Sequence, residues 1–385
     1  MKVLIAGAGI GGLTTAIALK RKGIAYEVFE AADELKSVGA GIWLGPNAMG
    51  MYRKLGIADK IQAVSTCLQK VYIKDYKGSV LQTIDNRVIY NKYGTTSQSI
   101  HRAVLQKLLA EEAGLQHIHL GKRCVSVKED ATGGVTVSFS DGTEASGDLL
   151  VGADGLRSVI REQYVTNVAY RYSGQTCWRA IVNLTLPENE KYESAEVWGY
   201  KAGLRASYSQ SSNNEVYFWY TKAMQSGVKL TNEEALDMIK KDLQPFSGKM
   251  NMVVDKIHAD KLICNELTDF KPIDKWYKGR VVLLGDAAHA TTPNLGQGAS
   301  QAIEDAYVLA GCLSAKKEIE DAIIYYQSLR LKRAKMIVNT SYQLAMITNF
   351  KSKFARACRN FLMKHSPEFI SQKQLDALYN VEYPV

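Results

Sequence analysis

The sequence contains few cysteines, and their arrangement excludes two classes of protein. Only six of the 385 residues are cysteine, and no two of them form a CxxC pair. A disulfide framework is therefore not expected, and a reducing cytoplasmic compartment fits better. No cluster of cysteine and histidine has the spacing of a zinc site, so we expect no metal.

Long apolar runs are missing as well. No stretch reaches the about 18 consecutive apolar residues that a membrane-spanning helix requires. The first apolar run, residues 3–6, is too short for a signal peptide and is followed by glycines. The sequence has only seven prolines and no low-complexity tract, which argues against disorder. We expect a folded cytoplasmic protein.

Positive charge is in excess, but the excess lies at one end. The formal net charge is +9, from 48 basic and 39 acidic side chains. Residues 330–385 contain ten Lys or Arg and three Asp or Glu, a net of +7, which leaves +2 for residues 1–329. A protein that binds nucleic acid over its whole surface is therefore not expected.

The order of the expected elements indicates an α/β fold in which one domain interrupts another. Residues 2–30 predict a buried strand, a glycine-rich turn, a helix and a second strand. Strand-like segments rich in Trp and Tyr follow in the middle of the chain, and a buried strand and helix return near residue 280. We expect a Rossmann-like domain of residues 1–170 and 271–330, an inserted antiparallel-sheet domain of residues 171–270, and a C-terminal helical tail of residues 331–385.

The first turn carries a dinucleotide-binding motif. Residues 7–12 read GAGIGG and fit G-x-G-x-x-G between a strand and a helix. Gly7 permits the tight turn, Gly9 lets a pyrophosphate approach, and Gly12 allows the helix to pack closely on the strand. Glu30 ends the second strand, where an acid accepts hydrogen bonds from ribose hydroxyls. The motif predicts a dinucleotide but does not separate FAD from NAD(P).

Two further strands end in an acidic residue beside a glycine. The first precedes Asp154 and Gly155, and the second precedes Asp286. An aspartate at such a strand end can bond ribose or ribityl hydroxyls. Residues 293–298, PNLGQG, then lead into a helix whose free backbone N–H groups favour an electron-rich ring edge.

Together these motifs resemble the FAD-dependent aromatic hydroxylases, the single-component flavoprotein monooxygenases typified by p-hydroxybenzoate hydroxylase. The resemblance rests on residues 7–12, 101–105, 147–161 and 279–305, and residues 39–47 are similar as well. It implies a bound FAD, NAD(P)H as a transient co-substrate, and molecular oxygen.

The resemblance also implies roles for individual residues. It assigns Gly7, Gly9, Gly12, Glu30, Arg102 and Asp286 to FAD, and Asp154 and Gly155 to FAD and NAD(P)H together. It places Gly296, Gln297 and Gly298 beside the flavin ring, and Pro293 with Gly296 at the pocket where oxygen reacts. His289 looks like a general base, but the resemblance favours a structural role.

The implied reaction is hydroxylation or epoxidation of a small aromatic or polycyclic molecule through a flavin C4a-hydroperoxide. The chemistry belongs to the cofactor, so no protein nucleophile is expected. Two alternatives stay open at this point. One is a flavin oxidoreductase that inserts no oxygen, and the other is a non-catalytic flavin-binding protein. We expect a monomer or a homodimer.

Aromatic residues of the inserted sheet are candidates for the substrate wall, although core packing is the better explanation for any single one of them. Tyr217 and Trp219 share one face of a strand, and Phe218 and Tyr220 share the other. The candidates of this sheet, with the neighbouring Arg179 included, are Trp178, Arg179, Trp198, Tyr208, Tyr217 and Trp219, and Trp43 in the loop after the second strand could also close the pocket.

The basic tail contains an apolar helical stripe of Phe350, Phe354, Cys358 and Phe361 with lysines and arginines between them. One interpretation is a helix that docks on anionic lipid. The other is a helix that packs on both domains and exposes a basic face. The second is favoured, because one stripe and one run of charge are common on protein surfaces.

Overall fold

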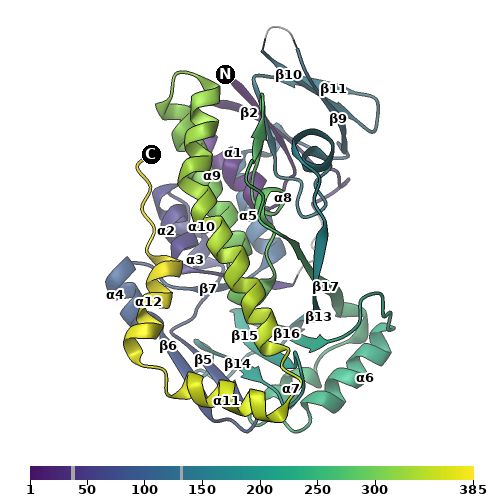
Figure 1. Ribbon diagram of the computed structural model, residues 1–385, viewed down its shortest axis with the longest axis vertical. Coiled ribbons are helices and arrows are strands. Elements are labelled where there is room, and N and C mark those ends of the chain that lie inside the picture. The colour runs from purple at the N-terminus through teal and green to yellow at the C-terminus, as the bar shows by residue number, and fades with distance from the viewer. Residues whose placement is uncertain (36–39, 131–132) are drawn as a thin grey trace.

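The computed structural model describes residues 1–35, 40–130 and 133–385, and Figure 1 shows two sheet-based parts, one above the other. The chain begins in the upper part, forms both parts in alternation and ends with helices that run between them. Gly39, which the sequence analysis grouped with residues 40–47, lies outside the described residues.

A six-stranded sheet forms the centre of the upper part. Its order is β18-β19-β12-β1-β2-β8, and all neighbours are parallel except β18 and β19. Helices cover one face and a three-stranded sheet, β11-β10-β9, lies on the other (Figure 1), so Leu4 and Ile5 of β1 are completely buried. The strands of both sheets are β1 (Lys2–Ala6), β2 (Ala25–Phe29), β8 (Ile118–His119), β9 (Cys124–Glu129), β10 (Val135–Phe139), β11 (Glu144–Gly147), β12 (Leu149–Gly152), β18 (Tyr277–Lys278) and β19 (Val281–Leu283).

The helices of the upper part pack on this sheet and on one another. The longest of them, α9, contacts both α1 and α2. The apolar residues of α1 and α9 are almost all buried, in agreement with their continuous apolar sequences. These helices are α1 (Ile10–Arg21), α2 (Pro46–Lys54), α3 (Ala58–Ala63), α4 (Asn86–Tyr93), α5 (Arg102–Ala113), α8 (Asp286–His289) and α9 (Gly298–Ala315).

A seven-stranded sheet, β17-β13-β16-β15-β14-β5-β6, forms the lower part. It is antiparallel except that β14 and β5 are parallel. Two of its strands, β5 and β6, come from residues 70–85, far ahead of the segment 171–270 that the sequence analysis assigned to this sheet. The strands are β5 (Lys70–Asp75), β6 (Val80–Asp85), β13 (Tyr170–Asn183), β14 (Glu193–Trp198), β15 (Arg205–Ser212), β16 (Glu215–Ala223) and β17 (Ile263–Phe270).

Each face of the lower sheet has a different partner. Helices α6 (Asn232–Leu243) and α7 (Met250–Val254) cover one face and bury a second hydrophobic core there. The other face is turned toward the upper part and meets the small sheet β3-β7-β4. That small sheet consists of β3 (Gly41–Leu44), β4 (Thr66–Cys67) and β7 (Gln98–His101).

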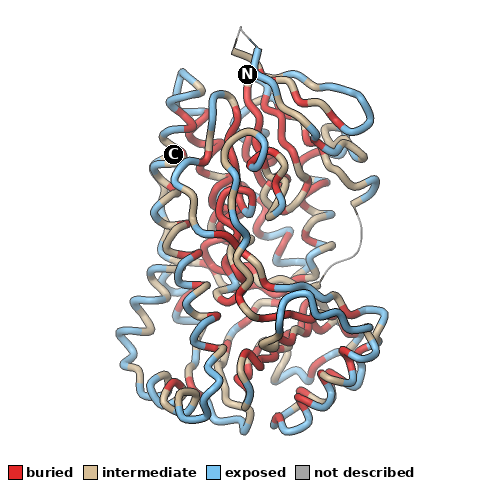
Figure 2. The backbone as a smooth tube through the Cα atoms, turned by 45° about the vertical axis from the view of Figure 1, so that its right-hand side comes forward, coloured by how far each residue is buried: buried red, intermediate tan, exposed pale blue. Residues whose placement is uncertain are grey.

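Three helices complete the chain. Helix α10 (Ile319–Thr348) runs from the upper to the lower part, so it crosses the boundary that the sequence analysis set at residue 330 (Figure 1). Helix α11 (Lys353–Lys364) packs on β6, and α12 (Glu368–Tyr379) packs on α2. The backbone of α11 and α12 is mostly exposed or intermediate in Figure 2, in contrast to the buried central strands.

A buried cluster of charge joins α9 to α10. Glu304 and Asp305 are completely buried, and so is Arg330, which forms ion pairs with both. Arg333 pairs with Glu304 at 2.7 Å, and Tyr383 near the chain end donates to Glu304 at 2.6 Å. Burial alone raises the pKa of each acid, but Arg330 and Arg333 beside Glu304, and His289 and Arg330 beside Asp305, outweigh it and hold the pKa of both at about 2.

We expect Arg330→Met to destabilise the protein strongly, since it leaves two buried carboxylates without their shared partner. Loss of one member of a buried ion cluster costs about 3–5 kcal/mol of unfolding free energy. Urea denaturation of the variant measures this cost. Lys332→Met, at an exposed position of the same helix, is the matched control. Equal unfolding free energies for the two variants would contradict the prediction.

The same cluster predicts a dependence on acid. The folded pKa of Glu304 and Asp305, about 2, lies below the unfolded values of about 4. The acids therefore contribute stability above about pH 4 and lose it as the pH falls toward about 2. Urea denaturation across this window should show unfolding free energy falling with pH, and a Glu304→Gln/Asp305→Asn variant should show a smaller fall. An identical slope in both proteins contradicts this assignment.

Candidate active site

The turn between β1 and α1 leaves room for a ligand at only one of its motif glycines. Gly7 adopts φ +109°, and a Cβ on Gly12 would lie 1.9 Å from the carbonyl oxygen of Gly7. A Cβ on Gly9 would meet no atom within 4 Å, and Gly9 lines a large cavity. Gly7 and Gly12 thus shape the turn, while Gly9 faces the space where a pyrophosphate would meet the N-terminus of α1.

Glu30 supports this turn from the end of β2. One carboxylate oxygen accepts from the backbone N–H of Ala8 at 2.7 Å, and the other accepts from Ala32 at 2.9 Å. Both oxygens keep further lone pairs for the hydroxyls of a ribose. The ribose contact expected from the sequence stays a prediction.

Two aspartates stand at the strand ends that the sequence indicated. One oxygen of Asp154 accepts from the backbone N–H of Ile160, whereas the other is buried without a partner among the described residues. Burial raises the pKa of Asp154. Asp286 is exposed and lines the cavity. Gly155 also lines the cavity, and a Cβ there would meet nothing within 4 Å.

The segment from Pro293 to Gly298 forms one wall of the same cavity. It begins with a single 3-10 turn, reverses at Gly296 with φ +62°, and starts α9 at Gly298. Gln297 is buried behind this wall, and its side-chain oxygen accepts from Asn47 at 2.9 Å. Of the residues predicted to lie beside the flavin, Pro293, Gly296 and Gly298 line the cavity, whereas Gln297 is buried behind them.

His289 has a structural role here. It is buried, its Nε2 lies 2.5 Å from an Asp305 oxygen, and its ring lies 5.0 Å from that of Trp276. It is absent from the cavity lining, in agreement with the structural interpretation rather than with a general base.

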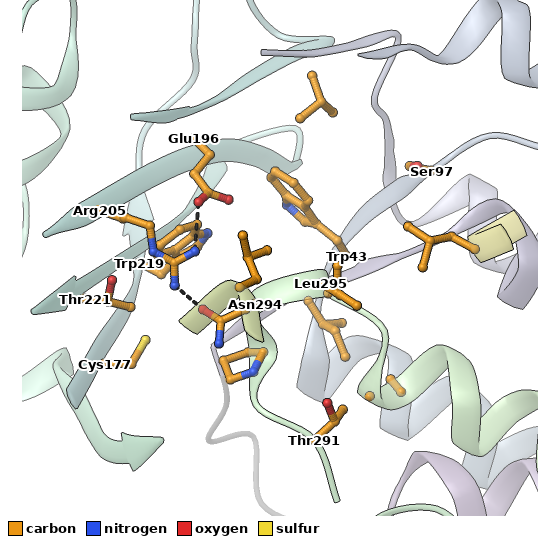
Figure 3. Close-up of a pocket in the computed structure, with 18 of the residues that line it drawn as sticks. Trp43, Ser97, Cys177, Glu196, Arg205, Trp219, Thr221, Thr291, Asn294 and Leu295 are labelled. Atoms are coloured by element: carbon orange, nitrogen blue, oxygen red, sulfur yellow. Dashed lines mark hydrogen bonds and ion pairs between the residues drawn. The ribbon is translucent and has the colours of Figure 1, made fainter. Parts of the chain in front are cut away.

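The lower sheet and β3 of the small sheet contribute an aromatic wall. Trp43, Arg179, Trp198, Tyr217 and Trp219 line the cavity, as the sequence analysis expected for a substrate wall. The indole N–H of Trp43 donates to the hydroxyl of Ser209 at 2.9 Å. In Figure 3, Trp43 and Trp219 lie on either side of the space beside Leu295. Burial raises the pKa of Tyr217 to about 12, so its phenol is neutral.

Two of the aromatic candidates lie elsewhere. Trp178 is buried on the opposite face of the sheet, with its ring 5.7 Å from that of Tyr220. Tyr208 packs against the same second core, and neither residue belongs to the cavity lining. The alternation of side chains explains both positions, because Arg179 follows Trp178 and faces the cavity, and Tyr208 pairs with Phe218, whose neighbours Tyr217 and Trp219 face it.

The structure adds Arg205, which the sequence analysis did not single out. Its buried guanidinium forms an ion pair with Glu196 at 2.9 Å and donates to the side-chain oxygen of Asn294 (Figure 3). It also lies 5.6 Å from the ring of Trp219. Arg205 thus joins the lower sheet to the Pro293–Leu295 turn. No local pattern marks it, because its partners come from distant segments.

The C-terminal helices supply the remaining wall. Residues of α10, α11 and α12 face β5 and β6 across a cavity of about 1280 Å³. This volume exceeds the about 300–1,000 Å³ of a pocket for one drug-sized ligand, so it has room for a dinucleotide ring and a substrate together. The apolar side chains of this wall are Val71, Ile73, Ile84, Leu344, Ile347, Phe350, Leu362, Met363, Leu375 and Leu378.

The side chains that line the cavity can bind and orient a ligand, and the buried thiol of Cys177 among them is not activated as a nucleophile. Burial raises the pKa of the Cys177 thiol, so this cysteine is neutral near pH 7. Among the described residues, no three His, Cys, Asp or Glu side chains are grouped so that they could hold a metal ion. The open Gly9, the unpartnered Asp154 oxygen and the N-terminus of α9 fit the phosphate, hydroxyl and ring-edge groups of FAD.

Comparisons with known proteins agree with this fit. A family model described as an FAD binding domain matches residues 1–341. The aurachin C monooxygenase/isomerase of Stigmatella aurantiaca is 37% identical over 380 residues, 98% of this chain and 96% of the relative. The 2-heptyl-3-hydroxy-4(1H)-quinolone synthase of Pseudomonas aeruginosa is 32% identical over 95% of this chain and 94% of its own length.

A solved structure is similar along almost the whole chain. The Klebsiella pneumoniae protein HpxO, complexed with FAD and uric acid, superposes with a TM-score of 0.90. It is 29% identical, and the match covers 98% of this chain and 96% of that one.

We expect Gly9→Ala and Gly12→Ala to fail in different ways. The methyl group at position 9 enters open space, so the fold persists while FAD binds at least about tenfold more weakly. The methyl group at position 12 meets the Gly7 carbonyl, so unfolding free energy falls by about 1–3 kcal/mol or more. Flavin release and denaturation of the FAD-free protein measure the two effects. The prediction is wrong if Gly9→Ala retains FAD as tightly as the unaltered protein.

Proposed function

The chain belongs to the FAD-binding domain family of flavoprotein hydroxylases and is an FAD-dependent monooxygenase. From this premise we propose that it uses NAD(P)H and oxygen to hydroxylate a bicyclic heteroaromatic ring that carries an apolar tail. The observation that carries the substrate class is the apolar wall of the cavity, which begins at β5 and β6 and continues over α10, α11 and α12. Oxygen insertion is supported by the relatives, in preference to the reductase and the non-catalytic protein that the sequence left open.

The names and structures of the relatives offer two kinds of substrate for comparison, one with an apolar tail and one without. The name of the Pseudomonas aeruginosa relative specifies a quinolone ring with a heptyl chain. HpxO has been solved with uric acid, a polar molecule without a tail. The ten apolar side chains of the wall offer little hydrogen bonding to a tail-less polar ring, but they would bury an alkyl or isoprenoid chain. The apolar wall therefore favours the tailed substrate.

The ring of the substrate has a different environment. Trp43, Tyr217 and Trp219 offer aromatic faces, and the neutral phenol of Tyr217 can donate to a ring carbonyl. The guanidinium of Arg205 holds Asn294 and with it the Pro293–Leu295 turn. These residues would fix the ring against the flavin side of the cavity and set which carbon is presented.

The chain's part in the reaction is binding, orientation and exclusion of water. Bound FAD supplies the reaction with oxygen, which no side chain of the lining provides. The backbone N–H groups at the start of α9 favour negative charge at the edge of the ring beside them. Helices α11 and α12 cover the cavity, which limits the access of water to the reacting groups.

A series of 2-alkyl-4-quinolones of increasing chain length tests the proposal. Each buried methylene contributes up to about 0.8 kcal/mol, so kcat/KM for substrate-stimulated NAD(P)H oxidation should rise by up to about fourfold per methylene. Oxygen uptake and hydroxylated product should match the NAD(P)H consumed. A preference for uric acid, or rates independent of chain length, contradicts the substrate class.

A variant of the apolar wall sharpens this test. Leu375→Asn places an amide in the wall, so the gain per methylene should shrink toward unity. Ala377→Asn, at an exposed position of the same helix, is the control and should keep the full gain. An equal gain per methylene in both variants would show that the tail does not contact this wall.

A further inference from the structure

Helices α11 and α12 expose large apolar side chains, most of which do not line the cavity. Phe354, Phe361 and Phe369 are 78%, 61% and 70% exposed, and none of them lines the cavity. We call the surface formed by Phe354, Phe361, Leu362, Phe369 and Ile370 the phenylalanine face. The stripe predicted from the sequence is therefore divided, since Phe350 and Cys358 line the cavity while Phe354 and Phe361 face solvent. Large apolar side chains exposed together on two consecutive helices indicate an interaction site.

The charge around this face is of one sign. Residues 350–373 contain six Lys or Arg and one acid, Glu368, a net of +5. Two of the six are used internally, since Arg356 donates to backbone carbonyls and Arg359 is buried against Trp198. The other four are exposed and form no ion pair with any residue that the structure describes. They are Lys351, Lys353, Lys364 and Lys373.

We propose that the phenylalanine face docks on an anionic lipid bilayer. Aromatic side chains enter the boundary between headgroups and acyl chains, and nearby lysines are attracted to an anionic surface. A second copy of the chain fits less well, because a twofold contact would bring the same lysines of two copies together. Within the described chain, no helix is long and apolar enough to cross a membrane, so the contact lies along the surface.

The face borders the mouth of the cavity. Leu362 is 68% exposed and Phe350 is 38% exposed, yet both line the cavity. Helix α11 runs along the lower end of the molecule in Figure 1, with the cavity-facing strand β6 against it. A tailed substrate dissolved in the bilayer would thus enter beside the docked face. This route rests on the proposed function, whereas the docking does not.

Co-sedimentation with lipid vesicles tests the docking without substrate. The full chain should sediment with vesicles of phosphatidylcholine and phosphatidylglycerol, and less with phosphatidylcholine alone. Phe354→Ser/Phe361→Ser/Phe369→Ser should lower the partition coefficient by about tenfold or more. Lys351→Glu/Lys353→Glu/Lys364→Glu should do the same on anionic vesicles only. The matched control is Val88→Ser/Tyr90→Ser, at exposed apolar positions of α4.

Three results would overturn the proposal. They are no sedimentation of the full chain with anionic vesicles, equal binding by the serine variant, and a dimer in size-exclusion chromatography that the serine substitutions dissociate. The last would assign the face to a second copy. Turnover of a short-tailed, water-soluble quinolone without vesicles is measured on the same variants. If the unaltered protein does not turn over this quinolone, the proposed function is wrong. If it turns over the quinolone but does not bind anionic vesicles, only the docking is wrong.

Discussion

Two neighbouring carboxylates buried on α9 connect the segments that are predicted to face the flavin. Asp305 accepts from the backbone N–H of Gly285 and from His289, so it holds the turn before Asp286. Glu304 accepts from Asn47, whose amide also reaches Gln297 behind the Pro293–Gly298 wall. Arg330 neutralises both acids from α10. Because unpaired buried charge is costly, this cluster forces α2, α9, α10 and two cofactor-side turns into one arrangement.

The local features of this fold could be predicted from the sequence. The glycine motif at residues 7–12, α2 from Pro46 and α6 from Asn232 all carry their signals within a few residues. The strand ends at Asp154 and Asp286 were predictable for the same reason. A turn, a cap or a helical period is determined by neighbouring side chains, and it is therefore visible in the chain itself.

Features that depend on distant partners could not be predicted. Strand β5 joins the lower sheet by pairing with β14, and β6 joins it by pairing with β5, and no local pattern encodes either pairing. The alternation of side chains along a strand predicted that Tyr217 and Trp219 share one face of the sheet and Phe218 and Tyr220 the other. It did not predict which of the two faces lines the cavity. Trp178 and Tyr208 therefore remained candidates although they lie away from the cavity. Arg205 was missed because its meaning depends on Glu196 and Asn294, which only the tertiary fold brings close.

The end of the chain returns to the core, which bears on how molecules exchange with the cavity. Tyr383 donates a hydrogen bond to Glu304, and Val385 lies against Gly311 of α9. Helix α10, which precedes α11 and α12, also packs on α9. Helices α11 and α12 are thus the middle of a loop with two anchored ends, and they cannot swing away as a free tail. Any widening of the cavity mouth would then come from small displacements of the two helices against β6 and α2. The residence time of a bound molecule would be set by those displacements rather than by unfolding of the terminus.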